Sequence, residues 1–125
     1  MISHHAHTVG AIDGGTGIPG VGWSMEHGDL RIAHFFGLHG LQAIPFFAFL
    51  VRRRRRATSL IFTAAASYLG LIAILTWQAW RGESIVQPTA ATLMALGIWL
   101  VATVGALAVS QMEVVSGSRP AIQNL

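Results

Sequence analysis

The chain has 125 residues, of which 53% are hydrophobic and only 10% are charged. A soluble domain carries about 25% charged residues, so this composition excludes a disordered chain and disfavours a soluble globular domain. All eight basic residues are arginine, and five of them form one run, Arg52–Arg56; the pI of 11.2 therefore reports a cluster, and no nucleic acid partner is expected. The absence of cysteine excludes disulfides, thiolate metal sites and c-type haem attachment.

A glycine-rich segment occupies the beginning of the chain, where residues 10–23 contain six glycines and one proline. Gly15, Gly17 and Gly20 have the spacing of the GxGxxG dinucleotide motif. That motif needs a strand before it and a helix directly after it, and neither is indicated here. We therefore interpret the segment as a tightly turned loop on the membrane surface.

Three histidines near the amino terminus, His4, His5 and His7, carry ring nitrogens of the kind that bind zinc, copper or nickel. A metal site needs three or four fixed ligands, and a chain terminus rarely fixes them, so these residues are weak candidates and no metal site is predicted. Further along, Asp29 is expected to cap the first helix. Arg31 is expected either to extend to the membrane interface or to pair with Asp29.

Three apolar stretches follow, Ile32–Val51, Ala57–Trp80 and Thr89–Ser110, with 20, 24 and 22 residues and no formal charge. A helix needs roughly 20 such residues to cross the hydrocarbon of a bilayer. The sequence therefore predicts an all-α integral membrane protein with three transmembrane helices. Its parts are a glycine-rich segment (1–31), a transmembrane region (32–110) and a tail (111–125).

The arginines predict the orientation of these spans. Arg52–Arg56 fill the connection between spans one and two, and Arg119 follows span three, whereas only Arg31 and Arg81 lie on the other side. We expect the chain to lie in the inner (plasma) membrane of a cell. The positive-inside rule then places the five-arginine loop and the carboxy terminus in the cytoplasm, and the amino terminus outside. Tryptophans at the expected outer interface agree with this orientation; they are Trp23, Trp77 and Trp80.

The amino-terminal segment contains no apolar run that could serve as a signal peptide. Two explanations for how this segment reaches the outer side are equally open. The short segment crosses the membrane unaided, or a preceding span has been lost to a late start codon.

A row of polar side chains in the first span is the most informative feature of the sequence. At about 100° per residue, His34, His39 and Gln42 share one arc of the helix, and they lie roughly 4, 12 and 16 Å below Arg31. Intramembrane ionisable residues face protein or water and are functional candidates. His39 is equally consistent with a structural hydrogen bond and with a ligand or proton-handling role. Either role predicts that the row is turned away from lipid.

Residues in the other spans suggest how the helices pack. Tyr68 lies near the depth of Gln42, and a hydrogen bond between them is expected. Small residues four apart predict close helix packing, within the chain or against a partner; they are Ala66 with Gly70 and Ala102 with Ala106.

The run GDLRIAHFFGLHGLQAIP (28–45), after HTVGAIDGG (7–15), resembles small polytopic bacterial inner-membrane proteins of uncharacterised activity. They have a glycine-rich outer loop and a first span of the GDLRxAHFxGLHxxQ type. The resemblance covers roughly the first 45 residues and implies a multi-pass membrane location, with no activity to transfer. Such proteins have a further span before the loop. This chain departs from them at that point, and the difference favours the late-start explanation.

Three functions are consistent with these features. The first is a non-catalytic small subunit, or an assembly or stabilising element, of a larger membrane complex such as a respiratory or photosynthetic one; its partners would be lipid and either other subunits or copies of itself. The second is a tetrapyrrole-binding protein for haem or bacteriochlorophyll (or chlorophyll), in which His39 or His34 supplies the axial nitrogen, Arg31 meets a propionate and Gln42 lies nearby. A small transporter or proton-relay unit ranks third, because the spans carry no carboxylate and no repeat.

An enzyme is not expected, because acid–base chemistry needs groups that converge on one site. The carboxylates all fall in loops or tails; they are Asp13, Glu26, Asp29, Glu83 and Glu113.

Overall fold

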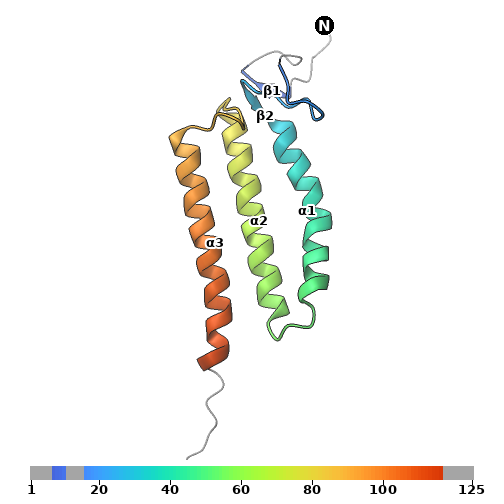
Figure 1. Cartoon of the computed structure of the whole chain (residues 1–125), viewed down its shortest axis with the longest axis vertical. Helices are drawn as coiled ribbons and strands as arrows, with labels where there is room; N and C mark the ends of the chain where they lie inside the picture. Colours follow the sequence, from blue (N-terminus) through green and yellow to red (C-terminus); the bar gives the residue numbers. More distant parts are fainter. Residues whose placement is uncertain (1–6, 11–15, 117–125) are drawn as a thin grey trace, which may run out of the picture.

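The computed structural model describes residues 7–10 and 16–116, with side chains up to Ser110. Three long helices make up most of the molecule, and a two-stranded antiparallel pairing joins the amino-terminal segment to the start of the first helix (Figure 1). The elements are β1 (Thr8–Val9), β2 (Gly28–Asp29), α1 (Leu30–Val51), α2 (Ala57–Trp80) and α3 (Ala90–Ser116).

Each of the three helices is long and apolar enough to span a membrane, which confirms the prediction of three helices of membrane-spanning length. Helix α2 has the bounds that the hydropathy pattern predicted. Helix α1 begins slightly earlier than predicted, at Leu30, because the Asp29 carboxylate caps it by accepting from the Arg31 amide. Helix α3 continues past the predicted end at Ser110 to Ser116, because the polar residues that follow the apolar run do not stop a helix.

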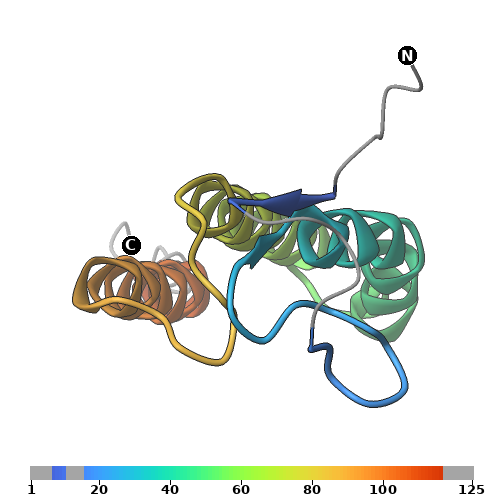
Figure 2. The same ribbon diagram turned by 90° about the horizontal axis from the view of Figure 1, so that it is seen from above.

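The helices form a row in which α2 lies between α1 and α3 and packs against both (Figures 1 and 2). Small residues allow both approaches. Gly40 of α1 is buried, and its Cα faces the ring of Tyr68 on α2. Gly70 of α2, one of the small residues singled out for close packing, faces the indole of Trp99 on α3.

Polar side chains fasten α2 to α3 in the middle of their length. The hydroxyls of Ser67 and Thr103 lie 2.7 Å apart and share a hydrogen bond. The indole Nε1 of Trp99 donates to the carbonyl of Ser67 at 2.8 Å. Hydroxyl and indole groups need partners in hydrocarbon, so these contacts also satisfy the groups that make them.

The predicted hydrogen bond between Tyr68 and Gln42 is wrong. The Tyr68 hydroxyl donates instead to the carbonyl of Phe36, at 2.7 Å. The helical wheel explains the error: Gly40, which packs on Tyr68, lies about 160° around α1 from Gln42. Gln42 is on the exposed side of the helix and does not face α2.

The row has very little interior. Its buried hydrophobic residues, within the described part of the chain, are Ile32, Ala33, Leu60 and Ala79. Many large apolar side chains are exposed along all three helices, for example Leu41 at 75% and Val101 at 73%. Such a surface suits a lipid environment, where exposed apolar side chains carry no cost. The buried polar residues gather mainly at one end of the helices, described next.

Candidate functional site

Buried and partly buried polar residues form a cluster, which we call the polar cap, at the end where α1 and α3 begin and α2 ends. Its members come from the loop before α1, the end of α2, the α2–α3 loop and the first turn of α3. They are Ser24, Asp29, Arg31, Gln78, Glu83, Ser84 and Thr92.

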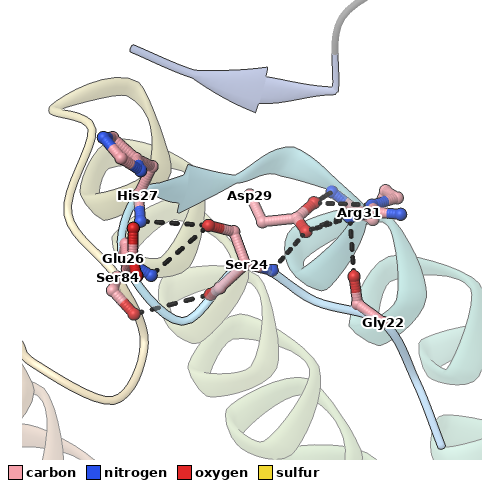
Figure 3. Close-up of polar contacts among 7 residues, drawn as sticks. All are labelled: Gly22, Ser24, Glu26, His27, Asp29, Arg31 and Ser84. Carbon is pink, nitrogen blue, oxygen red and sulfur yellow. Dashed lines mark hydrogen bonds and ion pairs between the residues drawn. The ribbon is translucent and has the colours of Figure 1, made fainter. Parts of the chain in front are cut away.

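Asp29 is the centre of the cap on the α1 side (Figure 3). Its side chain is completely buried and accepts from the backbone amides of Ser24 at 3.0 Å and Arg31 at 2.9 Å. The Arg31 guanidinium bridges both carboxylate oxygens, with Nη2 2.6 Å from Oδ2 and Nε 2.9 Å from Oδ1. Arg31 Nη2 also donates to the carbonyl of Gly22 at 2.9 Å, so the pair fixes the loop to the start of α1.

The pKa of Asp29 reflects these contacts. Burial acts to raise the pKa, but the hydrogen bonds from the Arg31 side chain and from the amides of Ser24 and Arg31, together with the arginine charge, outweigh it. The pKa is therefore below its ordinary value, and the group is a carboxylate at neutral pH.

Two serines connect the loop before α1 with the loop between α2 and α3 (Figure 3). The Ser24 hydroxyl accepts from the amide of His27 at 3.0 Å, which turns the chain back toward β2. The Ser84 hydroxyl donates to the Ser24 carbonyl at 3.5 Å. The Ser84 carbonyl accepts from Nε2 of the buried Gln78 side chain at 3.0 Å. Gln78 lies in the last turn of α2, so these bonds join three segments of the chain.

Glu83 binds the start of α3 as Asp29 binds the start of α1. Its carboxylate accepts from the Thr92 hydroxyl at 2.6 Å and from the Thr89 hydroxyl at 3.0 Å, and it pairs with Arg81 at 2.7 Å. The pKa of Glu83 is lowered, chiefly by the Thr92 hydrogen bond; burial opposes that effect, and Thr89 and the Arg81 charge add to it. Both cap carboxylates thus lie at helix amino termini, where a negative charge is favoured by the helix dipole.

The cap is tightly packed. Gly28 is buried against the end of α2, and a Cβ at this position would overlap the carbonyl group of Ala79. The cavity between Asp29 and Glu83 is only about 10 Å³. Every buried side-chain nitrogen or oxygen in the described residues has a hydrogen-bond partner. Among the described residues the polar cap is therefore a close-packed, fully hydrogen-bonded cluster that joins the ends of the three helices.

The residues singled out from the sequence are divided between two places. Arg31 belongs to the polar cap, and its guanidinium is held by Asp29. His34, His39 and Gln42 are exposed along α1, so the described chain does not itself cover them. His34 lines a shallow groove of about 470 Å³ beside α2, together with Gly37 and Thr76.

His39 has a defined environment although it is exposed. Its Nδ1 lies 2.8 Å from the carbonyl of Phe35, and the two rings stack with centroids 4.0 Å apart. A carbonyl only accepts hydrogen bonds, so Nδ1 carries the proton, and in the neutral ring Nε2 is left with a lone pair. Such a bond from Nδ1 to a backbone carbonyl is also the common arrangement behind a histidine that ligates a metal through Nε2.

A second groove, of about 340 Å³, runs between α2 and α3. Its walls carry small side chains, and its floor is the Ser67–Thr103 pair beside Trp99. The predicted small residues that line it are Ala66, Ala102 and Ala106, which are exposed.

Of the remaining histidine candidates, only His7 lies among the described residues. His4 and His5 lie outside the described residues, and His7 is exposed, with its carbonyl accepting from the amide of Leu30. Within residues 7–10 and 16–116, no three histidine or carboxylate side chains lie close enough to hold a metal ion.

Sequence reasoning missed Glu83, Ser84 and Gln78 as parts of one site. The available signal was the pair Thr89 and Thr92 at the start of a span, preceded by a glutamate in a short loop.

Comparison with known proteins gives no relative for this arrangement: no family model, no curated protein and no solved structure matches the chain.

Proposed function

We propose that the chain is a non-catalytic small subunit, or an assembly or stabilising element, of a larger membrane complex. The observation that carries this proposal is the exposure of His34, His39 and Gln42 on a helix that is apolar enough to span a membrane. Polar side chains at membrane depth are costly against lipid and face protein or water. Another helix, from a partner subunit or a second copy, covers them in the assembled complex.

The lone pair of His39 Nε2 supports the same proposal. The Nδ1 proton is bonded to the Phe35 carbonyl, and His39 is exposed, so a neighbouring molecule can donate to Nε2. The open groove lined by Ala66, Ala102 and Ala106 offers a second place where a neighbouring helix can approach closely. The polar cap holds the three helices in register for these contacts.

Site-specific crosslinking in the native membrane tests the proposal. A photoreactive residue at position 42 should give a discrete crosslinked species, whereas one at Phe62, exposed at 71% on α2, should give none or a diffuse smear. Equal lipid-only labelling at both positions would contradict the proposal.

Tetrapyrrole binding is the second candidate, and the His39 geometry favours it. Nδ1 is bonded to a backbone carbonyl, and Nε2 is the nitrogen available for an axial bond to the iron of haem or the magnesium of bacteriochlorophyll. Phe35 packs against the imidazole and Phe46 is exposed lower on the same helix, so both suit the wall of a ring site. Arg31 is already bonded to Asp29 and would meet a propionate only alongside that carboxylate.

His39→Gln separates the two candidates. In a helix–helix contact an amide replaces a neutral imidazole as donor and acceptor, so the variant should assemble normally. In a tetrapyrrole site the same change should abolish pigment binding, because an amide oxygen is a poor axial ligand. The measurement is the visible absorption spectrum of the chain purified with its native complex. A wild-type preparation without pigment absorption would exclude the second candidate.

We also propose an orientation for the chain in the inner membrane. Arg52–Arg56 lie in the cytoplasm, and the polar cap lies outside. The arginine distribution supports it. Thr58 is exposed at the start of α2, and the chain has no native cysteine, so Thr58→Cys gives a single labelling site. We expect an impermeant thiol reagent to label it only after the cells are opened, and Val86→Cys, in the exposed α2–α3 loop, to be labelled in intact cells. The reverse pattern would overturn the orientation.

A further inference from the structure

The five consecutive arginines lie in the connection between α1 and α2, at the end of the molecule opposite the polar cap (Figure 1). The connection between α1 and α2 is tightly turned: the Arg54 amide donates to the Val51 carbonyl, and the Ala57 amide donates to the Arg54 carbonyl. These turns hold the arginines close together at the ends of two apolar helices. The side chains of Arg52 to Arg55 are exposed.

Two arginines of the run are anchored to the helices. Arg52 lies over the ring of Phe49, with its guanidinium carbon 4.1 Å from the ring centroid, and Arg56 donates to the carbonyl of Ser110 on α3. These contacts fix both ends of the run. Arg53, Arg54 and Arg55 are thus presented between two fixed points.

The carboxylates whose side chains the structure describes lie away from these arginines. The cap carboxylates Asp29 and Glu83 are at the other end of the helices and are paired with Arg31 and Arg81. The last turns of α3 contribute one acidic residue, Glu113, to the basic end. The four exposed arginines Arg52–Arg55 therefore present positive charge that complements a polyanion.

We propose that Arg52–Arg55 form a binding surface for the phosphate headgroups of anionic phospholipids. The surface begins where the apolar length of α1 ends, which is the depth of lipid phosphates beside a membrane-spanning helix. Guanidinium groups bind phosphate oxygens in pairs, with two parallel hydrogen bonds. A juxtamembrane cluster of basic residues gains affinity from each charge close to an anionic surface.

The test uses the full chain in an uncharged detergent, titrated with short-chain phosphatidylglycerol, phosphatidylcholine or inorganic phosphate while thermal unfolding is followed. Phosphatidylglycerol should raise the unfolding midpoint, and the other two should not at equal concentration. The shift should shrink at high salt, because exposed charges are screened. Equal shifts with both lipids would overturn the proposal, and a shift with inorganic phosphate alone would identify a soluble anion instead.

Variants sharpen the result. Replacing Arg53, Arg54 and Arg55 together by glutamine should weaken the apparent affinity for phosphatidylglycerol on the order of 100-fold, whereas Arg119→Gln should leave it unchanged. Because the triple glutamine variant can also insert poorly, the triple lysine variant is measured beside it. Lysine keeps the charges and loses the paired hydrogen bonds, so it should bind between the wild type and the glutamine variant. Wild-type affinity in the glutamine variant would overturn the proposal.

Discussion

Gly28→Ala should destabilise the chain by about 3 kcal/mol, although it adds only one methyl group. The added Cβ would overlap the carbonyl oxygen of Ala79 and would also lie 2.9 Å from its carbonyl carbon and 3.0 Å from its Cα. All three are backbone atoms at the end of α2, so no side-chain rotation relieves the overlap. The strand pairing of β1 with β2 and the adjoining Asp29 contacts would have to move away from α2 together.

Gly37→Ala is the matched control for this substitution. Gly37 lies inside α1, and a Cβ there meets nothing within 4 Å. Alanine is the better helix former, so the control should keep or raise the thermal midpoint, measured by circular dichroism in detergent. If Gly28→Ala and Gly37→Ala had equal midpoints, the close contact between the cap and α2 would be contradicted.

Asp29→Asn should lower stability by about 2 kcal/mol at neutral pH and should reduce the sensitivity of the chain to acid. The aspartate accepts hydrogen bonds on both oxygens and neutralises Arg31, whereas an asparagine has one accepting oxygen and no charge. Its amide nitrogen would therefore face a donor in a fully buried position.

The pH dependence follows from the lowered pKa of Asp29. A carboxyl whose folded pKa is depressed stabilises the fold fully above its unfolded pKa, about 3.9, and loses that contribution as the pH falls through the folded pKa. Wild-type stability should therefore fall below about pH 4. Glu83 also has a lowered pKa, so the variant should retain part of the acid effect.

Glu26→Gln is the control for the loss of a carboxylate. Glu26 is exposed in the same loop, and its carboxylate accepts a long hydrogen bond of 3.3 Å from the Thr16 hydroxyl. Its thermal midpoint should follow the wild type from about pH 7 to about pH 3. An Asp29→Asn variant with the full wild-type acid response would show that another group controls it.

Hydropathy and charge alone were enough to predict the three helices, and the Asp29 cap followed from local helix chemistry. These features depend on neighbours in the sequence, so a single chain reveals them. The partner of Tyr68 depends on which side of α1 faces α2, and the burial of Gly40 decides that. Gln42 was predicted as the partner of Tyr68 from its depth along the helix alone, and depth does not specify the direction in which a side chain points.

The polar cap was the least predictable part, because its contacts join residues as far apart as Ser24 and Ser84. The residues around each serine in the sequence form no motif that indicates a partner. Their pairing arises only when α2 returns the chain to the level at which α1 began. Conversely, the row of polar side chains on α1 was readable from the sequence, yet the folded chain leaves it exposed, and our proposal assigns its cover to another molecule.

The arrangement of the helices in a row has a consequence for how the sequence can change over evolutionary time. A row with so small an interior places few packing demands on exposed positions such as Leu41, Phe62 and Val101, since one apolar side chain contacts lipid as well as another. Gly28 and Asp29 have no such freedom, because backbone and charge contacts fix both. Descendants of this chain would therefore diverge quickly along the spans and slowly at the cap, and a polar position on α1 that resisted such drift would reveal where a neighbour binds.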